Sequence, residues 1–233
     1  MIGSSFATTD LRGLRVLHCP ADVGGHPTSL ARAERELGLD SVCVLLDGTG
    51  MRRELQRWRL LRRAFREFDV VHFNFGSTLL PRWWPSVHHG KRALYGVYAR
   101  TLELRDAGWL RRAGKAVFVT FQGDDARTAD ALRSRVDDTR WLGEYYDRRD
   151  DARKRRAAAQ LAAVADGVFV LNPDLLALLP EAKFVPYASV DPREYTPSHL
   201  TWLRAQTGLT LDDLLSFGGA KAFVCTGRTI QRL

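Results

Sequence analysis

Three short turns in the sequence combine glycine with side chains that can form hydrogen bonds to a ligand. These turns are Gly24-Gly25-His26, Asn74-Phe75-Gly76 and Gln122-Gly123-Asp124. Two adjacent glycines allow positive φ angles and let a ligand approach the backbone closely. If a helix starts at such a turn, its free N–H groups and its dipole favour a bound anion such as phosphate. Because Gly24-Gly25 lacks the spacing of the dinucleotide pattern GxGxxG, the pair also fits an ordinary tight turn between strand and helix.

Each of the three turns follows a run of apolar residues that predicts a buried β-strand. The predicted strands comprise residues 14–17, 41–46, 69–73, 116–120, 166–171 and 183–185. Apolar strands that alternate with helices predict an α/β fold, with a parallel sheet covered by helices on both faces. Ligands of such folds bind at the carboxyl edge of the sheet. The turns are therefore expected to gather at this edge.

The predicted helices comprise residues 27–37, 51–68, 91–112, 150–165 and 175–179. Gly38 is placed to cap the first of them, and Asn172 to cap the last, with Pro173 at its first position. Residues 127–149 are polar and are predicted to form a loosely ordered excursion.

The helix predicted over residues 51–68 is strongly amphipathic. Its apolar stripe comprises Met51, Leu55, Trp58, Leu61, Phe65 and Phe68. The arginines of the segment lie largely on the opposite side, so the pattern favours a helix packed on the core with a solvated basic face. The alternative is that the basic face contacts anionic lipid headgroups.

Composition narrows the function classes. The chain has 233 residues, a net charge of +8 and 45% hydrophobic residues, so it can bury a sizeable core and favours anionic partners. Its three cysteines, Cys19, Cys43 and Cys225, are widely spaced and predict a reducing, cytoplasmic setting without a metal site. The adjacent His88 and His89 cannot both reach one metal from a regular element, so no zinc site is expected.

Five segments, taken in their order and spacing, resemble the N-terminal half of the GT-B glycosyltransferases. The closest likeness is to the retaining family 4, or group 1, type found in bacteria. The segments are GGH after the first strand, FDVVHFNFG, VFVTFQGDD, ADGVFVLNPDLL and FVPYASVDPREYTP. The likeness covers roughly Leu14 to Pro197.

The resemblance implies one of two Rossmann-like domains that face each other across a cleft. The N-terminal domain would hold a glycan or lipid acceptor, and the second domain would hold the nucleotide-sugar donor, with no metal or other cofactor. Gln122, Gly123 and Asp124 match a His-Gly-x-Asp loop beside the transferred sugar, with Gln122 and Asp124 as the implied catalytic residues. The implied binding residues are Gly24, Gly25, His26, Asn74, Gly76, Gly123, Asn172 and Asp174.

Two departures from the family pattern qualify these expectations. Glutamine stands at position 122 where many relatives carry histidine, and an amide can donate a hydrogen bond but cannot titrate. Residues 1–197 match the acceptor-side domain, whereas residues 198–233 are too short for a donor domain. The chain is therefore expected to have little transferase activity alone. It would be either a truncated enzyme or a natural short chain that works with a separate donor-domain subunit.

Three other functions remain as alternatives. The first is a non-catalytic module that binds an anionic lipid or glycan, which includes peripheral contact with the inner face of the cell membrane. Nucleic-acid binding is disfavoured because the arginines are scattered and no helix-turn-helix pattern is present. A Rossmann oxidoreductase lacks its glycine pattern here, and Asp47 is the one candidate for its acidic residue.

Overall fold

A computed structural model describes residues 11–46, 50–82, 93–133 and 148–187 of the chain. Several sequence-based predictions lie outside these residues: Asp47, most of the loop over residues 81–90, the middle of the excursion over residues 127–149, and the segment 198–233. Within the described residues, no helix is both long and apolar enough to cross a membrane.

Six parallel strands form one sheet, as the sequence predicts. The strands are β1 (Arg15–Cys19), β2 (Asp40–Cys43), β3 (Val70–Asn74), β4 (Ala116–Phe121), β5 (Gly167–Val170) and β6 (Lys183–Phe184). Their order across the sheet is β2-β1-β3-β4-β5-β6. Every neighbouring pair is parallel, so the carboxyl ends of all six strands point toward the same edge. This is a Rossmann-like α/β arrangement.

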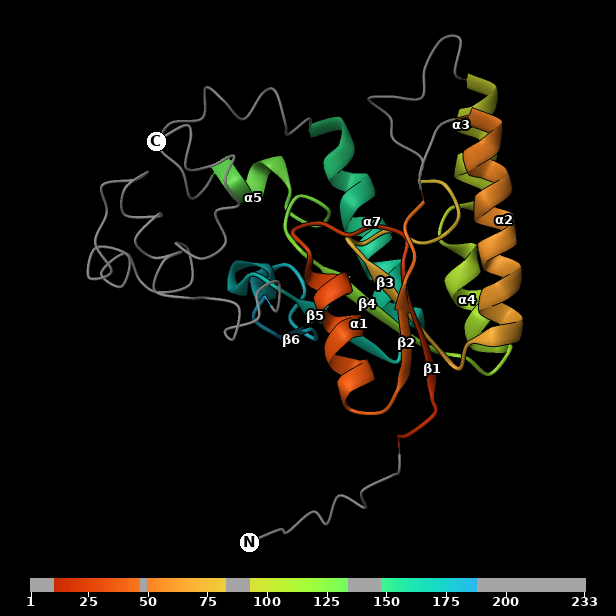
Figure 1. Cartoon of the computed structure of the whole chain (residues 1–233). Coiled ribbons are helices and arrows are strands. Elements are labelled where there is room, and N and C mark those ends of the chain that lie inside the picture. Colours follow the sequence, from red (N-terminus) through yellow and green to blue (C-terminus); the bar gives the residue numbers. More distant parts are fainter. Residues whose placement is uncertain (1–10, 47–49, 83–92, 134–147, 188–233) are drawn as a thin grey trace, which may run out of the picture.

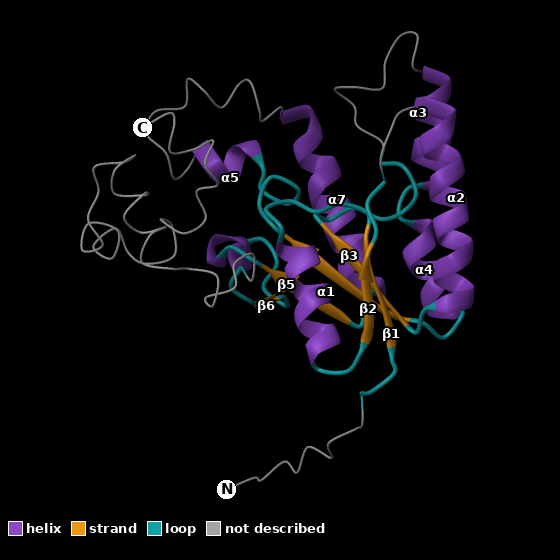
Figure 2. Cartoon of the chain, viewed as in Figure 1, coloured by secondary structure: helices purple, strands orange, loops and turns teal. Residues whose placement is uncertain are grey.

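Helices cover the sheet on both faces (Figures 1 and 2). The described helices are α1 (His26–Glu36), α2 (Gly50–Glu67), α3 (Ala93–Leu102), α4 (Arg105–Arg112), α5 (Ala129–Arg133), α7 (Arg148–Val164) and a 3₁₀ helix over Pro173–Ala177. Alternate strand residues point to opposite faces. Leu17 packs in the core on the face covered by α2, α4 and α7, whereas His18 points to the face covered by α1.

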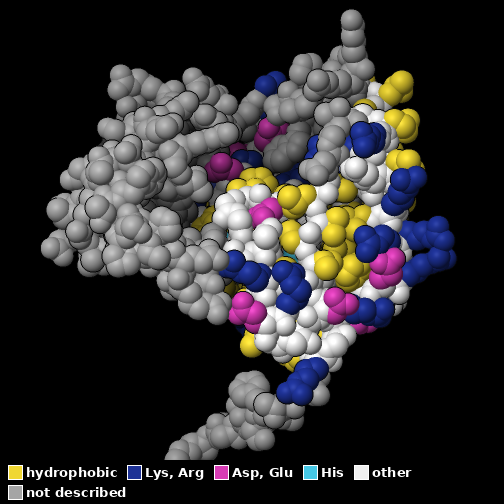
Figure 3. All heavy atoms as spheres, viewed as in Figure 1, with side chains coloured by type: hydrophobic (Ala, Val, Ile, Leu, Met, Phe, Trp, Pro, Cys, Tyr) yellow, Lys and Arg dark blue, Asp and Glu magenta, His cyan; other side chains and the backbone are white. Residues whose placement is uncertain are grey.

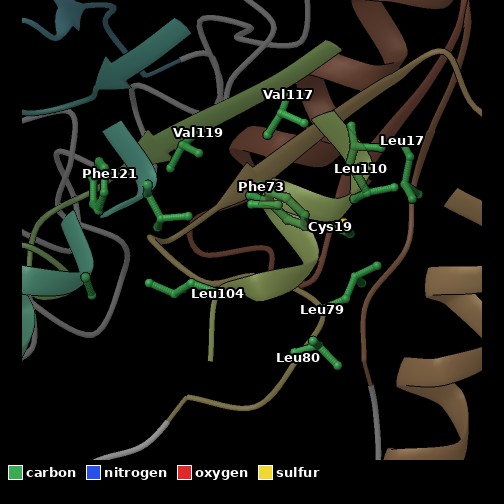
Figure 4. Packing of buried hydrophobic residues seen from close by; sticks show 14 of the residues in the cluster. Leu17, Cys19, Phe73, Leu79, Leu80, Leu104, Leu110, Val117, Val119 and Phe121 are labelled. Atoms are coloured by element: carbon green, nitrogen blue, oxygen red, sulfur yellow. The ribbon is translucent and has the colours of Figure 1, made fainter. Parts of the chain in front are cut away.

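The main core lies between the sheet and α2, α4 and α7. Leu17, Phe73 and Val117 contribute from neighbouring strands, and Leu110 contributes from α4; all four are fully buried. Figure 4 shows these side chains packed together with Cys19 of β1. The continuous apolar runs of the strands are explained by this burial on the α2, α4 and α7 face.

The first helix ends as the sequence predicts. Gly38 has φ +92°, its N–H donates to the carbonyl of Arg35, and the N–H of Leu39 donates to the carbonyl of Glu34. These two hydrogen bonds form the Schellman motif that ends many helices at glycine. Gly38 therefore caps α1.

The single helix predicted over residues 91–112 is wrong. The chain forms two helices, α3 and α4, which are separated at Leu104 with φ +59°. Leu104 is buried in the core cluster, so packing holds this residue in a conformation that disfavours helix continuation. Neither glycine nor proline marks the break in the sequence.

The prediction that α2 packs on the core is confirmed for only part of its apolar stripe. Leu60, Leu61 and Ala64 are buried in the second half of the helix, whereas Met51 and Leu55 in the first half are 84% and 50% exposed. The helix has 18 residues and the adjacent α4 has only 8, so α4 covers only part of the stripe. Met51 and Leu55 face solvent in the described structure, whereas the indole of Trp58 contacts Tyr98 of α3.

Three smaller expectations also need correction. The strand predicted over residues 41–46 ends at Cys43, although Val44 still donates its N–H to the carbonyl of His18 at 2.8 Å. The excursion predicted over residues 127–149 contains α5 and the first two residues of α7. Asn172 makes no side-chain capping hydrogen bond, and the element after it is a 3₁₀ helix.

Candidate functional site

The predicted turns all lie at the carboxyl edge of the sheet, and the structure ties four of its loops together. The rings of His26 and Tyr187, which follow β1 and β6, meet edge to face with their centres 6.0 Å apart. The Tyr187 hydroxyl donates to the carbonyl oxygen of Gln122, after β4, at 3.3 Å. The side-chain amide of Asn172, after β5, donates to the same carbonyl oxygen. We call this set of loops the carboxyl-edge site.

The loop after β4 is built around Asp125. Its buried carboxylate accepts the backbone N–H of Gly123 at 2.7 Å and that of Gln122 at 3.1 Å. Burial raises the pKa of this carboxyl above its usual range, while the Gly123 N–H and the Arg82 charge act in the opposite direction. Asp125 therefore fixes the backbone conformation at Gln122 and, with it, the position from which the Gln122 side chain extends.

Asp125 is a site residue that the sequence reasoning missed. A His-Gly-x-Asp pattern has one residue between its glycine and its aspartate, and this spacing places the aspartate of the QGDD segment at position 125. The side chain of the predicted catalytic residue, Asp124, is 64% exposed and lies 3.6 Å from Arg127. The structure therefore gives Asp124 a solvated position at the rim of the site.

The Gln122 side chain is buried, with 3% of the residue exposed. Neither its amide nitrogen nor its amide oxygen has a hydrogen-bond partner within the described residues. An unsatisfied buried polar group costs about 1–3 kcal/mol, and such groups are rare in folded proteins. A bound molecule that accepts from the nitrogen and donates to the oxygen would remove this cost.

Asn74 presents a second unsatisfied amide oxygen at the same edge. Its residue is fully buried, its amide nitrogen donates to the carbonyl of His72 at 3.1 Å, and its Oδ1 has no partner within the described part of the chain. Asn74 is paired in register with Thr120, and Gln122 follows two residues later. Because side chains alternate along a strand, Asn74 and Gln122 project from the same face of the sheet.

The turn after β3 requires glycine at position 76. Gly76 has φ +47°, and a β-carbon built there would lie 2.7 Å from Cε1 of Phe121. Phe75 before it also has a positive φ of 59°, which is uncommon for a residue with a side chain. Gly76 therefore lets the β3 and β4 loops approach each other beside Asp125.

An ion pair joins the loops after β4 and β5. The guanidinium of Arg127 donates to the two carboxylate oxygens of Asp174 at 2.9 and 3.1 Å. A bidentate pair of this kind fixes the geometry of both partners. Asp174, predicted to bind substrate, therefore orients Arg127 in this structure.

The turn after β1 brings backbone N–H groups to the edge. Gly24 and Gly25 both have positive φ, at 72° and 74°, and Gly25 precedes the first residue of α1. His26 begins the helix and is 3% exposed. Burial, together with the nearby His18, lowers the pKa of His26 to about 4, so its imidazole is neutral near pH 7.

A row of buried polar side chains lies beneath α1, next to the site. His18 forms a 2.8 Å hydrogen bond with Glu34, whose second partner is the hydroxyl of Ser41 at 2.6 Å. His72, the register partner of His18, shares a hydrogen bond with the hydroxyl of Thr120 at 2.7 Å. Burial, with the neighbouring histidines, lowers the pKa of His72 well below its ordinary value.

The buried row was also missed by the sequence reasoning. Its signal is a histidine inside each of two otherwise apolar strands. We expect this row to hold the carboxyl ends of β1, β3 and β4 in a fixed relation. Among the described residues, no group of three or more His, Cys, Asp or Glu side chains is suited to hold a metal ion.

Taken together, the carboxyl-edge site offers neutral hydrogen-bonding groups on a rigid frame. Buried amides come from Asn74 and Gln122, a neutral imidazole from His26, and backbone N–H groups from the turn at Gly24 and Gly25. Such a set suits recognition of a molecule rich in hydroxyl groups. It lacks a buried titratable group at position 122, so acid or base catalysis by that residue is excluded.

Comparison with family models, with curated proteins and with solved structures found no match for this chain.

Proposed function

We propose that this chain is the acceptor-side domain of a GT-B type glycosyltransferase. In this proposal the carboxyl-edge site binds a hydroxyl-rich glycan or the sugar headgroup of a lipid. Sugar transfer from a nucleotide-sugar donor then occurs at this edge with retention of configuration. The observation that carries the proposal is the buried amide of Gln122, whose two polar atoms have no partner within the described residues.

An amide that is both buried and unsatisfied is suited to a sugar hydroxyl group. A hydroxyl can donate to Oε1 and accept from Nε2, so one ring with neighbouring hydroxyls satisfies both atoms. Asn74 adds a second acceptor from the same face. The role we propose for Gln122 is therefore to position the sugar, in contrast to the proton transfer that a histidine could perform.

Transfer requires donor and acceptor to be held together in a cleft from which water is excluded. The proposed donor side belongs to a separate donor-domain subunit. The turn at Gly24 and Gly25 would face the donor phosphates, because its free N–H groups and the positive end of α1 stabilise negative charge.

Binding of simple sugars tests the proposal directly. The full chain is mixed with methyl α-glucoside, methyl α-mannoside and methyl α-galactoside, and contacts are detected by saturation-transfer NMR. We expect a signal with at least one sugar, and its loss in Gln122→Leu. Gln160→Leu changes an exposed amide on α7 and serves as the matched control. Absence of any signal, or an equal signal in Gln122→Leu, would overturn the proposal.

A second candidate function is peripheral contact with an anionic membrane. Exposed apolar residues from α2 and α3 gather at one end of the two helices, with exposed arginines beside them (Figure 3). These residues are Met51, Leu55, Trp58, Leu94 and Val97. Apolar side chains that enter the acyl boundary, flanked by cations that pair with lipid phosphates, are typical of interfacial helices.

A fixed polar contact holds this surface together. The carboxylate of Glu54 on α2 accepts the hydroxyls of Tyr95 and Tyr98 on α3 at 2.8 and 3.0 Å. The indole of Trp58 donates to the Tyr98 hydroxyl at 3.2 Å. Sedimentation with phosphatidylglycerol vesicles tests this candidate. We expect binding that Met51→Ser with Leu94→Ser abolishes; equal binding of the double variant would contradict it.

A further inference from the structure

A groove lies between α4 and α7, and none of the residues named in the carboxyl-edge site lines it. It has a volume of about 850 Å³ and is lined by residues of α3, α4, α7 and the turn that joins α3 to α4. Pockets that hold small molecules commonly measure about 300–1,000 Å³. Arg111 of α4 donates to the carbonyl of Val164, at the end of α7, at 2.8 Å and so joins the two helices. We call it the α4–α7 groove.

The lining of the α4–α7 groove is strongly cationic. It contains six arginines and a single carboxylate, that of Glu103. The arginines are Arg100, Arg105, Arg112, Arg149, Arg153 and Arg156. Arg105 and Arg112 come from α4, while Arg149, Arg153 and Arg156 come from α7, so positive charge faces the groove from both walls.

Arg153 is the most buried of these arginines, with 7% of the residue exposed. It forms an ion pair with Glu103. Burial, together with the charge of Arg82, lowers the pKa of its guanidinium to about 8. Burial is the larger cause of this shift; the charge of Arg82 adds to it, and a bound anion would offset that second part.

The nearby acidic side chain of Asp151 does not supply that anion. Its carboxylate accepts the backbone N–H groups of Ala129 and Asp130 at 2.8 and 3.3 Å, and so caps α5. Lys154, the next residue along α7 from Arg153, donates to the carbonyl of Arg127 at 2.9 Å and faces the carboxyl-edge site. Lys154 is therefore not part of the groove lining.

The groove also has an apolar part. Leu104, Trp109, Ala157 and Val164 contribute to its lining between the arginines. Guanidinium groups bind phosphate oxygens through two parallel N–H donors, and arginine is preferred over lysine where such bidentate recognition matters. The combination suits a phosphorylated molecule with an apolar or aromatic portion.

We propose that the α4–α7 groove binds a ligand that carries two or more phosphate groups. The arginines of α4 hold one phosphate and those of α7 hold another, which draws the two walls together. This chemistry is shared by soluble polyphosphate esters and by phospholipid headgroups, and the two sources are separated experimentally. The inference does not depend on the sugar-binding role proposed for Gln122.

The first arm of the test is titration of the full chain with inorganic tripolyphosphate in a calorimeter at physiological ionic strength. The groove variant combines Arg105→Ala with Arg156→Ala, one from each wall. Both arginines are exposed and enter no ion pair among the described residues. The control combines Arg155→Ala on α7 with Lys183→Ala on β6, two exposed residues outside the groove lining, and removes the same charge.

We expect saturable binding that the groove variant weakens by about tenfold or more, which corresponds to about 1.4 kcal/mol. The control should bind like the parent chain. The second arm replaces tripolyphosphate with vesicles that contain cardiolipin, a lipid with two phosphate groups. A loss confined to the groove variant in either arm supports the proposal and identifies the source. No loss in either arm, or equal loss in groove and control variants, would overturn it.

Discussion

The carboxylate of Asp125 accepts the backbone N–H of Gly123 at 2.7 Å and so fixes the turn that carries Gln122. Asp125 is 2% exposed. We expect Asp125→Ala to lower the free energy of unfolding by about 2–4 kcal/mol, because it leaves two buried N–H groups without an acceptor. Urea denaturation measures this change. Asp124→Ala, on an exposed neighbour, is the control and should change stability by less than about 0.5 kcal/mol.

Gln122 should show a conflict between stability and binding. Replacement by leucine removes a buried amide that has no partner within the described residues, at similar volume. We expect Gln122→Leu to raise the free energy of unfolding by about 1 kcal/mol while abolishing sugar binding. Urea denaturation and saturation-transfer NMR on the same samples give both quantities. A destabilised variant would show that the amide has a partner in the unliganded chain.

The pair of Arg127 and Asp174 should be energetically coupled. The bidentate contact is partly buried, with side chains 19% and 32% exposed, so solvent screens it only in part. A double-mutant cycle with Arg127→Ala and Asp174→Ala is expected to give a coupling energy of about 1 kcal/mol. Coupling near zero would mean that the two loops are held by other contacts. Arg127→Lys should recover little of it, because lysine cannot bind both oxygens.

Stability should fall as the pH is lowered through the range set by His26. Its pKa is about 4 in the folded chain and 6.5 ordinarily, so the unfolded chain binds more protons between these values. The contribution of neutral His26 is fully present above pH 6.5 and decreases toward pH 4, by up to about 3 kcal/mol. Unfolding measured at several pH values in this range should give a flatter profile for His26→Gln. An unchanged profile would contradict the prediction.

Gly76 and Gly114 form a matched pair for substitution by alanine. Both have positive φ, at 47° and 77°, but a β-carbon at Gly76 meets Phe121, whereas nothing lies within 4 Å at Gly114. Gly114→Ala should cost about 1 kcal/mol of backbone strain, and Gly76→Ala should cost about 3 kcal/mol or more, because it adds the clash. Thermal unfolding of both variants measures the difference. Equal effects would show that Phe121 moves aside freely.

The sheet could be predicted from the sequence because each strand is a short apolar run bounded by turn residues. The parallel pairing of its strands could also be predicted, because apolar strands that alternate with helices favour parallel sheets. The break at Leu104 could not be predicted, because the backbone is turned there by packing in the core. The exposed half of α2 could not be predicted either, because amphipathic spacing does not reveal how far a neighbouring helix extends.

At the candidate site, the sequence spacing predicts where the loops lie. It does not predict which hydrogen-bond partners their side chains take. Asn172 has the residue type and position of a helix cap, yet its amide donates to the carbonyl of Gln122 in the structure. Asp174 is a plausible ligand-binding residue by position, yet it pairs with Arg127. Several donors lie near each acceptor, and the distances between them decide which hydrogen bonds form. These distances are set only when the strands pair in the folded chain.

Tyr187 is the point at which the chain passes from the described domain to the residues that follow. Its ring contacts His26 and its hydroxyl contacts the carbonyl of Gln122, so two loops of the carboxyl edge depend on one aromatic residue. A displacement of the backbone at this position would therefore be transmitted to both loops at once. A ligand bound at the carboxyl-edge site and the backbone at Tyr187 are therefore coupled. Tyr187 both supports the two loops and links their positions to that of the backbone that follows.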